Sequence, residues 1–195
     1  MDEKKDLTKH LIAGSLKELV MTVPFEKLTI KKITDQAGLI RPAFYRYFMD
    51  KYEAVEWIFR TEVLEGAEQL LDASENRAAL VYIFSSMRKD REYYQKIFQI
   101  TGQNSIEESM KRAFSEEFTV ILEKLYQTKE MPDNPVISVE SVAKFKADML
   151  TSFIREWVLN SRVDPTPDEL ANALIYMSTE PLIFDSHPQK NPSLQ

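Results

Sequence analysis

The chain has 195 residues, of which 44% are hydrophobic and 29% are charged, with four glycines and no cysteine. This is enough apolar material for a sizeable core, and so few glycines argue against a sheet-rich or loop-rich fold. The lack of cysteine excludes a disulfide framework and a thiolate metal site. No apolar run approaches the roughly 18 residues of a membrane-spanning helix, so we expect a soluble, cytoplasmic protein.

The net charge of −6 is divided unevenly along the chain. Residues 1–51 carry ten Lys and Arg against seven Asp and Glu, a balance of +3. Residues 52–195 carry fifteen against twenty-four, a balance of −9. A positive N-terminal part on an acidic body is compatible with binding of the first part to phosphate groups.

Three short helices are predicted in the N-terminal part. The first covers residues 6–22, where leucines and valine recur at helical spacing, and Pro24 ends it. The second begins after Thr29, whose hydroxyl can cap the open backbone N–H groups. Gly38 ends this helix, because glycine takes a positive φ without steric cost.

The third helix is predicted to start near Arg41 and Pro42 and to bury Phe44 and Phe48, which lie four residues apart. Its other face presents arginine and tyrosine side chains. Two short helices joined at one glycine, with the second offering such a face, are suited to the major groove of DNA.

The N-terminal 60 residues or so resemble the DNA-binding domain of the TetR family of transcriptional regulators. The resemblance is carried by Leu28-Thr29-Ile30, Ile33, Ala37-Gly38-Leu39, the run Phe44-Tyr45-Arg46-Tyr47-Phe48 and Asp50-Lys51-Tyr52. It implies that Ile40 and Arg41 meet base edges, with Ile40 placed to pack on a thymine methyl group. The residues expected to contact DNA are Thr29, Ile40, Arg41, Pro42, Ala43, Tyr45, Arg46, Tyr47 and Lys51.

The rest of the chain is predicted to form long helices. Asp50 with Glu53 indicates a capping box at the start of a helix to about Asp72, and Thr166 to Glu169 indicates the start of the last helix, which runs to about Phe184. Between them we predict helices over residues 75–87, 90–101, 104–128 and 138–160, and a proline-bearing loop over residues 129–136.

The sequence therefore predicts an all-α fold. It consists of a three-helix helix-turn-helix domain over residues 1–50, a helical ligand-binding and dimerisation domain over residues 51–186, and a frayed tail over residues 187–195. The last two helices carry more apolar surface than one side of a monomer needs, so we expect a homodimer formed through them. The alternative is that both faces belong to the internal core.

A regulatory ligand is expected in the middle of the body, where aromatic and methionine side chains gather and one arginine can anchor an acidic group. The candidate ligand-binding residues are Tyr94, Phe98, Met110, Phe114, Phe118, Phe153, Arg155 and Trp157. The alternative is that these residues form ordinary core.

The segments Arg91 to Phe98 and Phe153 to Leu170 resemble a TetR subgroup that includes the dihydroxyacetone kinase operon activator. Two functions are therefore expected as alternatives. In the first, a dimeric repressor leaves a palindromic operator on double-stranded DNA when a small-molecule effector binds. In the second, an activator or adaptor binds a partner protein through its C-terminal domain.

Catalytic or metal-binding chemistry has little support in the sequence. His10 and His187 are the two histidines and have no ligand spacing, and the acidic pairs Glu107-Glu108 and Glu116-Glu117 lie on amphipathic helices where solvated carboxylates are expected. No glycine-rich phosphate loop is present. We therefore expect neither an enzyme nor a cofactor nor a metal site.

Overall fold

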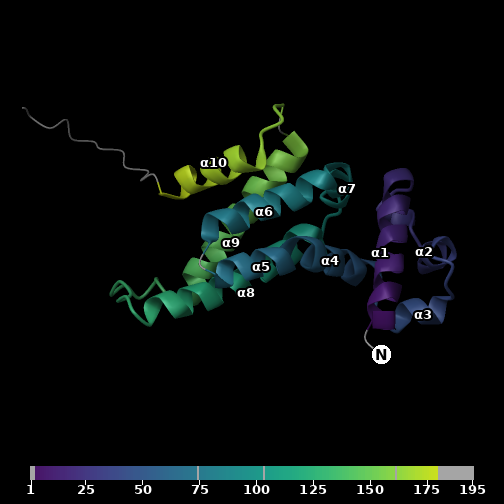
Figure 1. Ribbon diagram of the computed structural model, residues 1–195, viewed down its shortest axis with the longest axis horizontal. Coiled ribbons are helices and arrows are strands. Elements are labelled where there is room, and N and C mark those ends of the chain that lie inside the picture. Colours follow the sequence, from purple (N-terminus) through teal and green to yellow (C-terminus); the bar gives the residue numbers. More distant parts are fainter. Residues whose placement is uncertain (1–2, 74, 103, 161, 180–195) are drawn as a thin grey trace, which may run out of the picture.

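The computed structural model of the chain describes residues 3–73, 75–102, 104–160 and 162–179, and every regular element in these ranges is helical (Figure 1). The predicted all-α class is confirmed. The predicted last turn to Phe184 and the tail over residues 187–195 lie outside the described residues. The elements in chain order are α1 (Glu3–Thr22), η1 (Phe25–Lys27), α2 (Ile30–Gln36), α3 (Arg41–Tyr45), α4 (Lys51–Phe59), η2 (Arg60–Leu64), α5 (Glu65–Asp72), α6 (Asn76–Lys89), α7 (Arg91–Ile97), α8 (Ile106–Tyr126), α9 (Val139–Asn160) and α10 (Pro167–Thr179).

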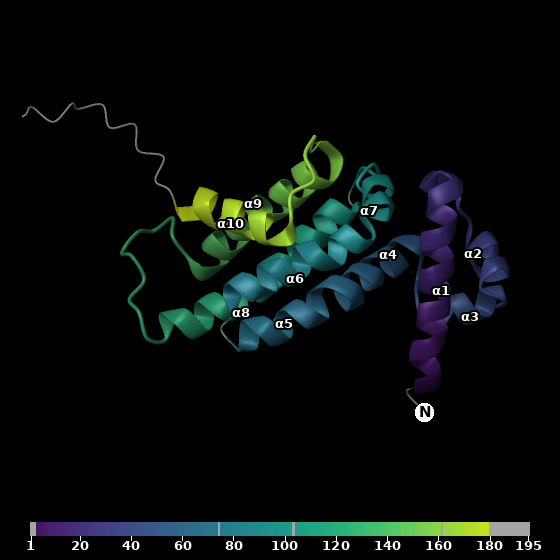
Figure 2. The same cartoon turned by 45° about the horizontal axis from the view of Figure 1, so that its top comes forward.

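Helices α1 to α3 form a head at one end of the molecule, and the later helices form an elongated body. Figures 1 and 2 both show α1 lying across the end of the body, with α2 and α3 on its far side. The head is held by fully buried Ile12, Leu16, Ile33 and Phe44. Each such side chain contributes roughly 1.5–3 kcal/mol on burial, so this small cluster is what fixes α2 and α3 on α1.

The connection between α2 and α3 has the geometry that its residues predict. The Thr29 hydroxyl accepts from the backbone N–H of Lys32 at 3.3 Å and caps α2. Gly38 has a φ of 67°, in the left-handed region that glycine tolerates. The half-buried Leu39 packs against the core between the two helices. The predicted turn is therefore confirmed.

A long interrupted helix, α4–η2–α5, leads from the head along the body (Figure 2). Asp50 caps it by accepting from the N–H groups of Tyr52 and Glu53, and the Glu53 carboxylate accepts in return from the Met49 N–H. The predicted helix start at Asp50 and the predicted end at Asp72 are confirmed, but the return bond of Glu53 goes to Met49 and not to the Asp50 N–H of a standard capping box. The sequence did not indicate that η2 is a π-helical turn, which widens the helix in its middle.

An ion network on α4 ties this helix to α8. The Glu56 carboxylate accepts from Arg112 at 2.6 Å, from the Ser109 hydroxyl at 3.1 Å and from Arg60 at 3.3 Å. Burial alone would raise the pKa of Glu56, but Arg112 and the other donors lower it below its ordinary value. The network therefore favours an ionised Glu56 and holds α8 beside α4.

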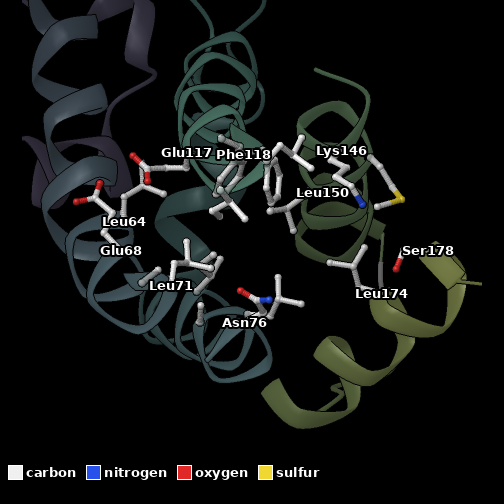
Figure 3. A pocket seen from close by; sticks show the side chains of 18 of the residues that line it. Leu64, Glu68, Leu71, Asn76, Glu117, Phe118, Lys146, Leu150, Leu174 and Ser178 are labelled. Atoms are coloured by element: carbon white, nitrogen blue, oxygen red, sulfur yellow. The ribbon is translucent and has the colours of Figure 1, made fainter. Parts of the chain in front are cut away.

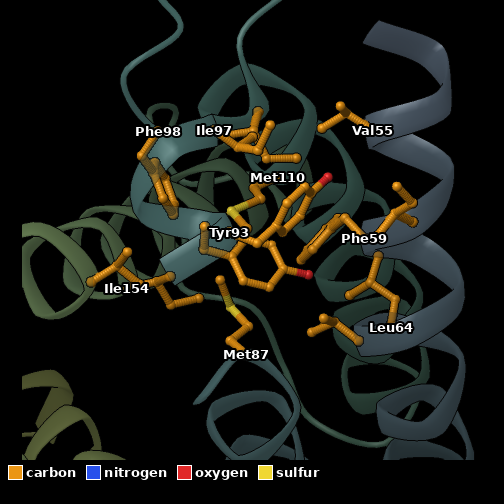
Figure 4. Close-up of a cluster of buried hydrophobic side chains, with 14 of the residues drawn as sticks. Val55, Phe59, Leu64, Met87, Tyr93, Ile97, Phe98, Met110 and Ile154 are labelled. Atoms are coloured by element: carbon orange, nitrogen blue, oxygen red, sulfur yellow. The ribbon is translucent and has the colours of Figure 1, made fainter. Parts of the chain in front are cut away.

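The body core is a layer of aromatic, methionine and aliphatic side chains between α4–α5, α6, α7, α8 and α9. Figure 4 shows Phe59, Met87, Phe98 and Met110 gathered around Tyr93 in this layer. Helices α8 and α9 pack along each other, and α10 lies on α6. In the described ranges, no helix is long and apolar enough to cross a membrane.

The last described helix begins where the sequence predicts it. The Thr166 hydroxyl accepts from the Glu169 N–H at 3.2 Å, and the Glu169 carboxylate accepts from the Thr166 N–H at 2.7 Å. This reciprocal pair satisfies two open N–H groups at the helix start. It fixes the point at which the chain turns back to place α10 over α6.

We expect Gly38→Ala and Gly14→Ala to change stability in opposite directions. A Cβ meets no atom within 4 Å at either position, so the two sites differ in backbone conformation alone. The positive φ at Gly38 makes alanine unfavourable by roughly 1–2 kcal/mol. In the helical interior of α1, alanine at position 14 is favoured by about 0.4–1 kcal/mol. Urea unfolding measures both shifts, and destabilisation by both variants would contradict this account.

Candidate DNA-binding head and body cavity

The face of α3 that points away from the head core carries most of the residues predicted to contact DNA. Ile40 is 71% exposed and Tyr45 is 50% exposed, and Arg41 is exposed between them. Pro42 and Arg46 are also exposed, on the first and last turns of this helix. The short helix and its two cap residues thus offer two apolar, two cationic and one aromatic side chain to a ligand outside the head.

Other predicted contact residues are less accessible. Ala43 and Tyr47 are half-buried, and the Tyr47 ring packs against the head core. Thr29 is exposed at the start of α2, but its hydroxyl is the helix cap. Two exposed basic side chains that the sequence analysis did not single out are Lys27, which precedes α2, and Lys32, in its first turn, and neither forms an ion pair with a described residue. Their ammonium groups are available to pair with a phosphate of bound DNA.

Arg41 is held along the surface of α3 by Tyr45. Its guanidinium donates to the Tyr45 hydroxyl at 3.3 Å and lies 5.9 Å from the centre of the Tyr45 ring. The two residues are four apart, so the helix itself brings them together. This contact limits the rotamers of Arg41 and presents its planar fork of N–H groups in one direction, which suits bidentate contact with a base or a phosphate.

Lys51 has a role that the sequence did not indicate. Its ammonium donates to the carbonyl oxygens of Phe25 at 2.6 Å and Leu28 at 3.0 Å, and it lies 4.5 Å from the centre of the Phe25 ring. Burial lowers the pKa of Lys51, although Glu26 and Asp50 oppose that change. The ammonium expected to meet a phosphate therefore holds the chain that leads into α2.

A cavity of about 370 Å³ lies in the body between α5, α6, α8, α9 and α10. Its inner wall is made of aliphatic side chains, among them Leu71, Ile83, Ile121 and Leu174, together with Phe118. A volume of this size and an apolar wall are typical of a site for a small organic molecule. The walls come from helices on both sides of the body, so a ligand there contacts most of the domain.

Polar groups stand at opposite sides of the cavity. Figure 3 shows Glu68 and Glu117 on one side and Lys146 and Ser178 on the other, with Asn76 also in the lining. No described residue forms an ion pair with Lys146, which is half-buried on α9. The cavity therefore combines an apolar interior with charges of both signs at its margin.

The structure brings together only part of the predicted ligand-binding set. Phe114 and Phe118 line the cavity. The buried Tyr94, Phe98, Met110 and Trp157 do not line it and belong to the closed core.

Two further members of the set lie elsewhere. Phe153 packs against Phe84, with 5.8 Å between ring centres, and Arg155 pairs with Glu107 at 3.3 Å. The predicted set consists mainly of bulky aromatic residues, whereas the lining of the cavity includes two short side chains, Ala67 on α5 and Ala79 on α6.

An apolar face remains uncovered on the last two helices. Phe145 on α9 is 70% exposed, and Tyr176 and Met177 on α10 are 63% and 60% exposed. A shallow groove between these helices continues the face through Phe153 and Val163. Such neighbouring apolar groups are what an interface between two protein surfaces requires.

The described residues contain no group of three or more His, Cys, Asp and Glu arranged to hold a metal ion. The His10 ring packs edge-on against Trp57, with 5.1 Å between ring centres. His187 lies outside the described residues.

Residues 75–180 match the TetR_C_8 family, described as the transcriptional regulator C-terminal region. The HTH-type dhaKLM operon transcriptional activator DhaS of Lactococcus lactis subsp. lactis (strain IL1403) is 26% identical over 98 residues, which are 50% of this chain and 52% of that protein. The match thus spans about half the length of this relative. It confirms the predicted partial likeness to the dihydroxyacetone kinase operon activator.

Solved structures share the fold of the whole chain. The dihydroxyacetone kinase operon activator DhaS superposes with a TM-score of 0.62 at 16% identity, covering 87% of this chain and 93% of that chain. NalD, the secondary repressor of the MexAB-OprM multidrug efflux pump in Pseudomonas aeruginosa, gives the same TM-score at 17% identity, covering 90% and 95%. Similar arrangements of head and body thus occur in an activator and in a repressor.

We expect Arg41→Ala to relax the preference for a single base pair at a cost of roughly 1–3 kcal/mol. Tyr45→Phe keeps the ring and removes only the hydroxyl that accepts from Arg41, so its effect should be smaller and lie at the same base pair. Fluorescence anisotropy on a bound duplex and its single-base variants measures both. An equal loss on specific and scrambled DNA would mean that Arg41 contacts phosphate.

Proposed function

Because the chain belongs to the TetR family of transcriptional regulators, we propose that it is a homodimeric repressor that a small-molecule effector releases from a palindromic operator. The observation that carries the proposal is that the long helix α4–η2–α5 packs against the DNA-binding head at its start and forms a wall of the cavity at its end. A ligand that favours another position of this wall can act on the head. By linkage, DNA then weakens binding of that ligand by the same factor.

The proposed DNA contacts fall into two groups. Ile40 and Arg41 are assigned to base edges, because they are the exposed side chains at the start of α3. The residues assigned to positioning on the phosphate backbone are Thr29, Pro42, Ala43, Tyr45, Arg46, Tyr47 and Lys51. The Lys51 ammonium would contact phosphate in addition to the backbone carbonyl oxygens before α2 to which it donates.

Two heads are needed because one short helix offers few contacts. In helix-turn-helix dimers the recognition helices read half-sites about one DNA turn, or ~34–36 Å, apart. We assign the dimer interface to the exposed face of α9 and α10. Two copies of this face would bury Phe145, Tyr176 and Met177 in a four-helix arrangement.

The effector is assigned to the apolar cavity. We propose Phe114 and Phe118 as contacts, and we replace the remainder of the predicted set by Ile121, Leu174 and Lys146. The matching ligand is a small apolar molecule with a polar end, because the interior is aliphatic and the charges lie at the margin.

A second candidate function is an activator whose body binds a partner protein. It is favoured by the match to DhaS, whose name describes a transcriptional activator. The two functions share the same head, so the response to a small molecule separates them. Release of DNA by an apolar compound alone would support the repressor, whereas a need for a second protein would support the activator.

The experiment that tests sequence-specific binding is selection from a random pool of DNA duplexes by the purified protein. We expect an inverted repeat to be enriched, with affinity that falls as salt rises because phosphate contacts release counterions. Enrichment of no sequence, with weak salt-sensitive binding everywhere, would contradict the proposal.

We expect Phe145→Glu to shift the protein from dimer to monomer and to weaken binding to the inverted repeat by about 100-fold or more, since the second head no longer binds with the first. Val136→Glu is the matched control, because Val136 is 79% exposed on the loop between α8 and α9. Analytical ultracentrifugation measures the assembly. A dimer that survives Phe145→Glu would place the interface elsewhere.

We expect Ile121→Trp to fill the cavity and abolish binding of the neutral fluorescent dye N-phenyl-1-naphthylamine, while binding to DNA remains. Val136→Trp is the control, because Val136 is 79% exposed on the loop between α8 and α9 and does not line the cavity. Dye titration followed by fluorescence measures the loss. If Ile121→Trp bound the dye as the unaltered chain does, the cavity would not be the site at which the dye binds.

A further inference from the structure

A charged cluster joins the head to the body at the point where α1 crosses it. The Lys17 ammonium on α1 donates to Glu62 at 2.8 Å and to Asp90 at 2.7 Å. Glu62 belongs to the π turn η2, and Asp90 lies between α6 and α7. One side chain of the head is therefore bound at once to two separate segments of the body.

The surroundings of the cluster favour a lysine there. The Lys17 side chain is only 21% exposed, and its ammonium lies 5.7 Å from the centre of the Tyr93 ring on α7. Burial alone would lower the pKa of Lys17, but the hydrogen bonds and charges of Asp90 and Glu62 raise it above its ordinary value. The ammonium thus stays charged, and without it two carboxylates would face each other beside a buried ring.

Both carboxylates belong to segments that also form the cavity. Leu64 lies two residues after Glu62 in the same π turn and lines the cavity. Ile83 of α6 lines it too, and α6 ends directly before Asp90. A displacement of either wall must therefore change the position of a carboxylate that binds Lys17.

The π turn interrupts the helix that forms one of these walls. A π turn holds an extra residue relative to the α-helix on either side, and such turns are common at functional sites. Here the turn separates α4, which packs on the head, from α5, which walls the cavity. Glu62 lies inside the segment whose register has to change if α5 shifts along α4.

We propose that Lys17 is a positioning residue that, through Glu62 and Asp90, fixes the angle of the head on the body and transmits movement of the cavity walls to the head. In a dimer this angle sets the distance between the two recognition helices. That consequence for DNA rests on the proposed function, whereas the control of the head angle does not.

Spin labels on the head and body test the angle directly without DNA. The chain has no cysteine, so Lys32→Cys on α2 and Glu123→Cys on α8, both exposed, provide the two attachment sites. Labelled chains are diluted with unlabelled chains, so that the distance within one chain is measured by pulsed electron spin resonance. We expect Lys17→Met to widen or shift this distance distribution.

Two variants serve as controls. Lys17→Arg keeps the charge and should restore the narrow distribution. Lys9→Met removes a positive charge from the same helix and should leave the distance distribution unchanged. The Lys9 ammonium lies 5.5 Å from the centre of the Trp57 ring. An unchanged distribution in Lys17→Met would overturn the proposal. If circular dichroism shows that Lys17→Met is unfolded, Asp90→Asn, which keeps the side-chain shape, decides in the same way.

The DNA consequence is tested on inverted repeats whose half-sites are separated by different numbers of base pairs. We expect Lys17→Met to lose about fivefold or more of its preference for the best spacing over the neighbouring ones, and Lys9→Met to keep it. An equal loss of affinity at every spacing would mean that Lys17 only stabilises the fold through its ion pairs and does not set the head angle. If the unaltered chain bound no inverted repeat, the proposed function would fail, and the distance measurement would still decide the role of Lys17.

Discussion

One interrupted helix, from Lys51 to Asp72, is shared by the two parts of the molecule, and its placement constrains both. At its start, Asp50 caps the helix and the Lys51 ammonium binds the carbonyl oxygens that precede α2. At its end, α5 forms a wall of the cavity. Because one helix packs against the head at its start and lines the cavity at its end, a displacement of this helix would change both.

The boundaries of the helices were predictable from the sequence because they depend on local groups. Thr29, Asp50 and Thr166 cap helices with their own side chains, and Gly38 supplies the positive φ of the turn. The predicted burial of Phe44 and Phe48 is confirmed, although α3 ends at Tyr45 and Phe48 lies after the helix rather than on its face. These features need no knowledge of distant parts of the chain.

The cavity and the polar contacts of the head were not predictable in the same way. Aromatic side chains such as Tyr94 and Phe98 fill the core, whereas the cavity is lined in part by the short side chains of Ala67 and Ala79. Lys51 binds carbonyl groups up to 26 residues earlier in the chain, and Lys17 binds Asp90, 73 residues later. Such partners are set by the packing of helices, which the spacing of residues in one helix does not reveal.

We propose that this TetR-family chain reads DNA sequence as a dimer through Arg41 and its neighbours on α3. Fluorescence anisotropy on duplexes tiled across the region upstream of its own gene, against scrambled DNA at two salt concentrations, tests this proposal. We expect tight binding to one tile that contains an inverted repeat, lost when that tile is scrambled. Binding that is equally weak and salt-sensitive on all tiles and on scrambled DNA, with no site selected from a random pool either, would contradict it.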